Sequence, residues 1–279
     1  MGTTRTTILT WTIALLTPVL AGSAVLAGPI GLIDDFADAS LAEYTLTKVL
    51  DQGAGTSNIS FSSPSGVLQV ASAGTTGAEQ VLLLRDDYTL DVGQTLLADV
   101  SGDANGWDRD FGIAVGYSKT PAGLGNPVAG DVRSSYVEVS YRSNNQVVSF
   151  ARNGAANLTS GQEFSGTMYG GESFTGYVDS LFIKRLTTNT YEVGWMDGGI
   201  RHVLTANGNP LGGVGIPYYT ITDANVPGAA VGFYADARAD VAASPSALDN
   251  LRIVPEPTAW CLAMLGIVGL ARLRKRTSL

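Results

Sequence analysis

Side chains suited to nucleophilic or metal chemistry are scarce in this chain. Nucleophilic catalysis needs a base beside the nucleophile, yet the sequence holds one histidine, His202, and no Gly-x-Ser-x-Gly elbow. A single imidazole cannot supply the usual ligands of zinc. The single cysteine, Cys261, has no partner for a disulfide within the chain and excludes a cysteine-ligated metal cluster. We therefore interpret His202 as a surface residue at a strand edge and expect no catalytic residue in the chain.

Carboxylate oxygens offer a different chemistry, because calcium prefers hard oxygen ligands. Asp34 and Asp35 stand near the start of the strand-rich body, and Asp249 and Asn250 stand near its end. If the first and last strands pair, these residues approach one another, and we predict a structural calcium ion there. A solvated acidic loop is the alternative. The acidic stretch "SGDANGWDRDFG" misses the spacing of an EF-hand loop, and a solvated loop is the simpler interpretation of it.

Exposed aromatic rings could bind sugars by stacking on them. The stretch "GIPYYTITD" presents Tyr218 and Tyr219 beside glycine and proline, and Trp107 lies in the acidic stretch. Neighbouring residues of a strand point to opposite faces, so only one of the two tyrosines need be exposed. We predict carbohydrate contacts from Trp107, Tyr218 and Tyr219, with core packing as the alternative role. Core packing is also the interpretation for Trp195.

Antiparallel strands must position these residues, because apolar and polar residues alternate along the body with a period of two. "SYVEVSYR" places Val137, Val139 and Tyr141 on one face. "SLFIKRLTTNTYEVGWMDGGIRHVLT" indicates three strands, with turns at 188–189 and 197–199, since Asn, Asp and Gly tolerate positive φ. "GAAVGFYADA" and "SALDNLRIV" close the domain. No long apolar stripe of helical period is evident, so helices should be few.

The composition agrees with this pattern. The 279 residues include 34 glycines, and only 15% of the residues are charged, which is typical of a β-protein with many turns. The hydrophobic content of 45% suffices for a core and argues against wholesale disorder. We predict an all-β fold for residues 28–254, a two-sheet antiparallel β-sandwich of the jelly-roll kind.

The amino terminus has the pattern of an export signal. Arg5 precedes the apolar stretch "ILTWTIALLTPVLAGSAVLAG", which ends in small residues. We predict a signal peptide over 1–27, cut between Ala27 and Gly28. A cut after Ala24 and an uncleaved anchor are the alternatives.

The carboxyl terminus is apolar and then basic. Residues 258–273 would span about 24 Å as a helix, which is short against a hydrocarbon core of about 30 Å. The basic cluster after them should stay on the cytoplasmic side; it comprises Arg272, Arg274, Lys275 and Arg276. Pro255 and Pro257 keep the preceding residues out of a helix. We expect an extended, accessible peptide just outside the membrane.

The stretch "VPEPTAWCLAMLGIVGLARLRKR" resembles a PEP-CTERM sorting signal: a Pro-Glu-Pro motif, a short transmembrane helix and an arginine-rich end. The resemblance covers about the last 25 residues, 255–279. It implies a Gram-negative bacterium that makes extracellular polysaccharide, and an exosortase that recognises Pro255, Glu256 and Pro257 in this substrate. An ordinary membrane anchor is the alternative.

The body resembles concanavalin-like or laminin-G-like domains in the layout of several stretches across its length: "IDDFADASLAEYTL", "DRDFGIAVGYS", "LFIKRLTTNTYEVGWMDGG" and "AVGFYADA…ALDNLRI". The resemblance implies that the first and last strands lie side by side. Glucanases of that class carry a Glu-x-Asp-x-x-Glu strand, whereas Glu138 stands alone in its strand here, and Glu192 and Asp197 have the wrong separation.

The charge distribution limits the classes of partner that the protein can bind. The segments 1–27 and 258–279 hold five of the 17 basic residues and none of the 25 acidic ones, which leaves a net charge of −13 between them. Such a surface repels nucleic acid. We expect an exported protein that passes through the inner membrane, meets signal peptidase and exosortase, and reaches the cell surface or extracellular matrix. Its role would be a non-catalytic one, glycan-binding or structural. A secreted concanavalin-like glycoside hydrolase or lyase is the alternative.

Overall fold

The structure is a computed structural model of the 279-residue chain. It describes ten segments: 31–51, 59–72, 79–101, 110–116, 135–142, 146–152, 178–204, 218–221, 228–237 and 246–255. Fifteen β-strands and a single 3₁₀ turn, Pro64–Gly66, make up the regular structure of these segments. None of their helices has the length and apolar character needed to span a bilayer.

Sheet A contains nine strands. Seven follow one path in the order β12 (Ile200–Val203), β11 (Thr190–Asp197), β10 (Ser180–Arg185), β6 (Gln94–Ser101), β15 (Ser246–Pro255), β4 (Leu68–Ser72) and β3 (Ile59–Ser62). Two further strands pair off this path: β1 (Gly31–Asp34) with β15, and β13 (Tyr219–Thr220) with β11. All of these pairings are antiparallel.

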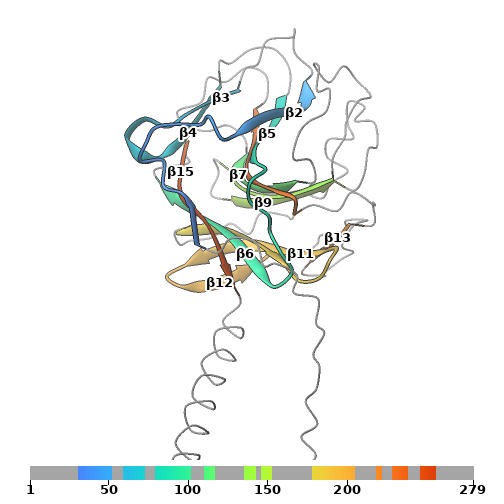
Figure 1. Ribbon diagram of the computed structural model, residues 1–279. Helices are drawn as coiled ribbons and strands as arrows, with labels where there is room; N and C mark the ends of the chain where they lie inside the picture. Colours follow the sequence, from blue (N-terminus) through green and yellow to red (C-terminus); the bar gives the residue numbers. More distant parts are fainter. Residues whose placement is uncertain are drawn as a thin grey trace, which may run out of the picture.

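Sheet B contains six antiparallel strands. They lie in the order β2 (Thr45–Asp51), β5 (Glu79–Arg85), β14 (Ala230–Ala237), β7 (Asp110–Gly116), β8 (Tyr136–Arg142) and β9 (Gln146–Arg152). In Figure 1, β6, β11 and β12 of sheet A lie below the strands of sheet B, and β15 runs up beside sheet B towards β4 and β3. The expected all-β architecture of two antiparallel sheets is confirmed.

One hydrophobic core joins the two sheets. Sheet A contributes Leu96, Ile183 and Ile253, and sheet B contributes side chains at alternate positions of β5, β7 and β14 to the same buried cluster. The alternation follows from the period of two in a β-strand. A second, smaller cluster contains Leu82, Leu84, Ala114, Tyr136, Ala230 and Tyr234, which all belong to sheet B. Sheet B is therefore buried on both faces.

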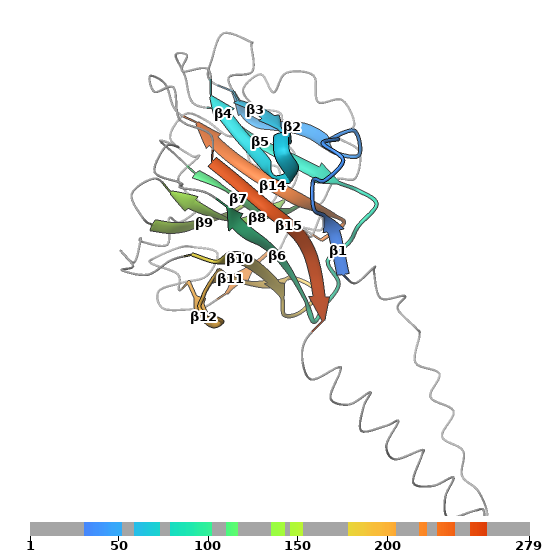
Figure 2. The same ribbon diagram turned by 90° about the vertical axis from the view of Figure 1, so that its left-hand side faces the viewer.

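The first and last strands lie side by side. Gly31 of β1 faces Ile253 of β15, and Asp34 faces Leu251 after a register shift. Figure 2 shows β1 beside the end of β15. The segments that precede residue 31 and follow residue 255 thus join the domain at one place.

The hairpin of β11 and β12 has the turn that its sequence predicts. Gly198 and Gly199 adopt φ angles of 56° and 80° between the two strands. Positive φ is readily reached by glycine, and the neighbouring residues Asp197 and Ile200 pair directly.

Candidate functional site

The outer face of sheet B, which points away from sheet A, is the most polar buried surface of the described residues. Val81, Ile113 and Phe233 belong to the main core, so the residues next to them in each strand point the other way. We call these the outer face of sheet B; its polar members are Gln80, Asp110, Tyr136, Glu138, Ser140, Tyr234 and Asp236. All seven are buried.

Two carboxylates oppose each other on this face. Asp236 of β14 is the register partner of Asp110 of β7, and directly opposed residues of neighbouring strands have Cβ atoms about 4.5–5.5 Å apart. The amide nitrogen Nε2 of Gln80 donates a hydrogen bond of 3.2 Å to Oδ2 of Asp236. A buried polar row formed by Gln80, Asp236 and Asp110 therefore crosses three strands.

One tyrosine of a stacked pair lies next to this row: Tyr234 is two residues before Asp236 on β14, whereas Tyr136 pairs with Gly116 at the other end of β8. The rings of Tyr136 and Tyr234 stack with their centroids 6.0 Å apart and their planes at 26°. Burial raises the pKa of Tyr234 well above its ordinary value, and the negative charges of Asp236, Glu138 and Asp110 raise it further. The phenol of Tyr234 therefore stays protonated at every physiological pH. The carboxylates that raise its pKa come from three different strands, β7, β8 and β14.

Glu138 is held by two serines. The hydroxyl of Ser140 donates a hydrogen bond to Oε2 of Glu138, and the hydroxyl of Ser149 donates one to its main-chain carbonyl oxygen. Ser140 and Glu138 are two residues apart on β8, so they lie on the same face of the strand. The contact with Ser140 holds the carboxylate within the outer face, whereas Ser149, the register partner of the core residue Val139, binds the main chain from the core side.

The centre of the face has little side-chain bulk. Gly112 of β7 is the register partner of both Tyr234 and Ser140. A Cβ at Gly112 would lie 1.9 Å from the carbonyl oxygen of Val139, so no larger residue fits there. The polar side chains of β8 and β14 accordingly flank a strand that bears glycine and alanine.

This arrangement groups hydrogen-bond acceptors, phenol donors and aromatic rings on one sheet face. The side chains are at most 5% exposed, so a ligand reaches them only when the face is uncovered. Carboxylates and phenols are the groups that bind sugar hydroxyls, and aromatic rings stack on apolar faces of ligands. An opposed pair of carboxylates is also the minimum requirement for glycoside hydrolysis.

The residues predicted to contact carbohydrate do not lie on this face. Tyr219 is fully buried in the main core and belongs to β13, whereas Tyr218 beside it is 38% exposed. Only one of the two is thus exposed, as the alternation predicts. Trp195 packs in the core, as expected, and its ring stacks on that of His202 at 4.9 Å. Trp107 lies outside the described residues.

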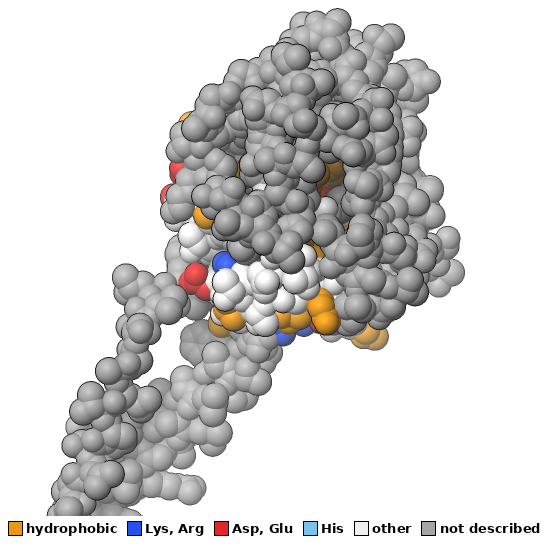
Figure 3. Space-filling view, turned by 90° about the vertical axis from the view of Figure 1, so that its right-hand side faces the viewer, with side chains coloured by type: hydrophobic (Ala, Val, Ile, Leu, Met, Phe, Trp, Pro, Cys, Tyr) orange, Lys and Arg blue, Asp and Glu red, His pale blue; other side chains and the backbone are white. Residues whose placement is uncertain are grey.

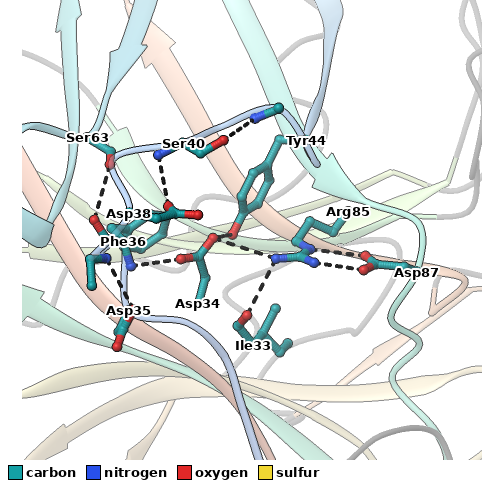
Figure 4. Close-up of polar contacts among 12 residues, drawn as sticks. Ile33, Asp34, Asp35, Phe36, Asp38, Ser40, Tyr44, Ser63, Arg85 and Asp87 are labelled. Atoms are coloured by element: carbon teal, nitrogen blue, oxygen red, sulfur yellow. Dashed lines mark hydrogen bonds and ion pairs between the residues drawn. The ribbon is translucent and has the colours of Figure 1, made fainter.

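The predicted calcium ligands near the first strand have other partners (Figure 4). Oδ1 of Asp34 accepts a 2.7 Å hydrogen bond from the amide of Phe36, and its Oδ2 accepts one of 3.0 Å from the hydroxyl of Tyr44. Nη1 of Arg85 lies 3.7 Å from the same Oδ2. Burial, partly opposed by these contacts, raises the pKa of Asp34. Asp35 is exposed and accepts a hydrogen bond from the amide of Ala37.

The predicted ligands on the last strand lie beside β6. Oδ1 of Asp249 accepts a hydrogen bond from the amide of Asn250, and Nδ2 of Asn250 donates one of 3.1 Å to Asp99. Arg252 also binds Asp99, at 2.7 Å. The pairing of β1 with β15 places Asp34 on a strand adjacent to that of Asp249 and Asn250, whereas Asp35 follows the end of β1. In the described segments, no three acidic, histidine or cysteine side chains are grouped as a metal site would need. Calcium binding stays a prediction.

The other predicted site residues lie mainly beyond the domain. Pro255 is the last residue of β15 and pairs with Gln94, so the first residue of the Pro-Glu-Pro motif belongs to the sheet. The signal cleavage site at 27–28, the motif residues Glu256 and Pro257, and the basic tail lie outside the described residues.

The outer face of sheet B was not predicted as a site. In the sequence Glu138 is the lone acid of its strand and Asp110 falls in an acidic stretch that resembles a loop, so no motif within one strand or loop marks either residue as part of a site. The residues grouped with Asp110 come instead from β14 and β5, since Asp236 and Gln80 are 126 and 30 positions away from it in the sequence. The one available signal is the polar residue at alternate positions of apolar strands, as in "GFYADA".

No family model matches the chain, and no curated protein matches its sequence. The solved structures similar to it include the following two. One comes from work on endo-acting O-glycanases by which human gut bacteria initiate mucin breakdown; it is 11% identical, with a TM-score of 0.41, and the match covers 81% of this chain and 99% of that one. The other is a carbohydrate esterase of the Shiga toxin-encoding bacteriophage phi24B, 11% identical, with a TM-score of 0.36 and coverage of 82% and 99%. Similarity at this level says nothing about the activity of this chain.

Proposed function

We propose that the protein is an exported glycan-binding component of the cell envelope or extracellular matrix, and that the outer face of sheet B becomes its ligand-binding surface when this buried face is uncovered. The observation that carries the proposal is the grouping of Tyr136 and Tyr234 with the carboxylates of Asp110, Glu138 and Asp236 on a buried sheet face. Polar groups on a buried face are costly to a purely structural sandwich, which could fill it with apolar side chains.

The chemistry of this face suits a neutral or basic sugar chain better than an acidic one. The negative charges of three carboxylates raise the pKa of the Tyr234 phenol. The chain outside its two terminal segments carries a net charge of −13. Uronic acids or sulfated sugars would be repelled by these charges. Hydroxyl groups of hexoses, or the amino group of a hexosamine, would be attracted.

Glycoside cleavage is the second candidate function, and the opposed pair Asp110 and Asp236 favours it. A retaining glycosidase keeps its two carboxyl groups about 5–5.5 Å apart, a spacing that directly opposed residues on neighbouring strands can reach. One residue would protonate the glycosidic oxygen while the other attacks the anomeric carbon, so that the glycosidic bond breaks and the alcohol leaves; water, deprotonated by the first residue, would then hydrolyse the glycosyl ester.

The export and sorting of the protein complete the proposal. The sequence patterns of residues 1–27 and 255–279 support passage through the inner membrane and processing at a PEP-CTERM signal by an exosortase. The pairing of β1 with β15 supports the concanavalin-like, jelly-roll topology. Calcium at the first and last strands belongs to the same proposal as a structural ion.

Binding of the purified protein to a panel of neutral, basic and acidic polysaccharides tests the proposed ligand class. Binding should weaken at least about tenfold in Tyr136→Ala, which removes one stacking ring, and in Asp236→Asn, which removes one charge. Glu192→Gln is the matched control, because Glu192 pairs with Arg201 on sheet A. Tyr218→Ala tests the exposed tyrosine separately. If no polysaccharide binds, a purely structural role replaces this proposal.

Release of reducing ends from a bound polysaccharide distinguishes the two functions. A glycosidase should release them, and Asp110→Asn should abolish the release while binding persists. A binding protein should release none, and the same substitution should weaken binding.

A further inference from the structure

Only a short stretch of chain connects the end of β15 to the apolar C-terminal segment. Pro255 pairs with Gln94 at the start of β6, and the apolar stretch begins at residue 258. Three residues in a fully extended chain span at most about 11 Å. Whenever the apolar stretch lies in a bilayer, the end of β15 must therefore lie within about 11 Å of the point where that stretch begins.

A rigid turn lies beside this exit point. The amide of Gln94 donates a 3.0 Å hydrogen bond to the carbonyl of Asp91, and Oε1 of Gln94 accepts one of 2.8 Å from the amide of Asp91. Gly93 supplies the positive φ of 83° that such a turn needs at its third position. Val92 occupies the tip and is 54% exposed. A large apolar side chain is thus held in solvent next to Pro255.

A second exposed apolar residue lies near the same end. Leu32 of β1 is 55% exposed and faces Arg252 across the strand pair. Val254 is two residues further along β15 and hence on the same face as Arg252. Figure 2 shows β1 and the end of β15 side by side, whereas Figure 3 faces the opposite side of the domain, where hydrophobic side chains with a few basic ones also lie along the lower margin of the described surface. We call Leu32, Val92, Val254 and Pro255 the exit patch.

We propose that the exit patch rests on the lipid headgroups while the C-terminal segment is in the membrane, so that the domain is held there in one orientation. This inference rests on the proposed sorting function. The short tether supplies the proximity, and the exposed side chains of Leu32 and Val92 supply the apolar contact with the interface. The net charge of −13 opposes contact with anionic lipid, so the partner is a zwitterionic lipid surface.

Docking would place the Pro-Glu-Pro motif at the level of the headgroups. Pro255 is fixed in the sheet, and only Glu256 and Pro257 separate it from the apolar stretch. A membrane-embedded enzyme would then meet the motif at a fixed distance from the headgroups, with sheet A on one side of the motif.

Fluorescence quenching in vesicles tests the docking. The full chain is reconstituted in phosphatidylcholine vesicles that carry spin-labelled lipid. Three single-cysteine proteins receive the same environment-sensitive fluorophore: the native Cys261, and Val92→Cys or Leu46→Cys in a Cys261→Ser background. Leu46 is the matched control, because it is 45% exposed and lies on β2, at the opposite end of the domain from the end of β15 (Figure 1).

The label at Val92 should lose most of its emission to a headgroup-proximal quencher and shift to the blue, whereas the label at Leu46 should keep both its intensity and its spectrum. Equal spectra at Val92 and Leu46, with Cys261 quenched from within the bilayer, would overturn the docking and leave the sorting proposal intact. An unquenched Cys261 would overturn the membrane step of the proposed function itself. Leu32→Cys gives a second probe of the exit patch should Val92→Cys fold poorly.

Discussion

Arg85 of β5 forms an ion pair with Asp34 of β1 and so connects the first strand to sheet B. Its replacement gives a quantitative test of the structure. The guanidinium lies 3.7 Å from Asp34 and donates hydrogen bonds of 3.0 and 2.7 Å to Asp87. It also covers the rings of Tyr44 and Tyr88, at 5.5 and 4.8 Å from their centroids. The side chains of Arg85 and Asp34 are each only 11% exposed, whereas that of Asp87 is 52% exposed.

We predict that Arg85→Met destabilises the protein by about 3 kcal/mol at pH 7. Removal of one partner from a buried ion pair costs about 3–5 kcal/mol. Asp34 keeps its hydrogen bonds from Phe36 and Tyr44. The cost of leaving the Asp34 carboxylate without Arg85 is therefore at the low end of that range. The exposed pair with Asp87 adds less than about 1 kcal/mol. For a domain of this size the melting temperature should fall by about 6–12 °C.

The loss should depend on pH with a definite sign. Burial already raises the pKa of Asp34 above 3.8, and the charge of Arg85 lowers it in part; without Arg85 the pKa rises further. An acid whose pKa is higher in the folded state favours folding at low pH, and that contribution is lost as the pH rises through the folded-state pKa. Arg85 holds the pKa of Asp87 low, and this stabilisation is lost as the pH falls. Both effects make the deficit of Arg85→Met small at pH 3 and full at pH 7.

Urea unfolding of wild type, Arg85→Met, Asp34→Asn and the double variant at both pH values supplies the measurement. The double variant should lose less than the sum of the single variants, because no uncompensated charge remains. A deficit that is the same at pH 3 and pH 7, together with additive losses, would refute the assignment of Arg85 as the buried partner of Asp34.

Three further predictions address other parts of the molecule. Gly112→Ala should lower the free energy of unfolding by about 3 kcal/mol or more, because its Cβ would meet main-chain atoms of Val139 and Ser140. Ala114→Gly in the same strand is the control and should lower it by only about 0.5–1 kcal/mol. Similar urea midpoints for the two variants would contradict the close approach of the two strands. Saturating calcium should raise the melting temperature, and a shift under about one degree on addition or chelation would end the calcium prediction. Alanine at positions 255–257 should leave an unprocessed, membrane-retained form in cell fractionation, and equal release of both proteins would argue against sorting.

The strands were largely predictable because their cues are local. The alternation in "SYVEVSYR" corresponds to β8, with Val137 and Val139 in the core and Glu138 on the other face. Glycine at positions 198 and 199 marked the hairpin of β11 and β12. The pairing of the first and last strands, expected from the resemblance of the body to concanavalin-like domains, is confirmed.

The candidate site was not predictable to the same extent, because it is built across strands. Asp110 and Asp236 are 126 positions apart in the sequence, and only the order of β14 and β7 in sheet B makes them neighbours. Alternation shows that Glu138 and Tyr234 leave the core side of their strands. It does not show that the opposite face is also buried.

A crystal structure of the protein with a bound oligosaccharide, chosen from the polysaccharide panel, tests the central claim most directly. We predict a sugar ring against Tyr136 or Tyr234, with a hydroxyl or amino group within hydrogen-bonding distance of Asp110, Glu138 or Asp236. A sugar seated on the outer surface of sheet A, or on Tyr218, with the outer face of sheet B unchanged, would contradict the claim.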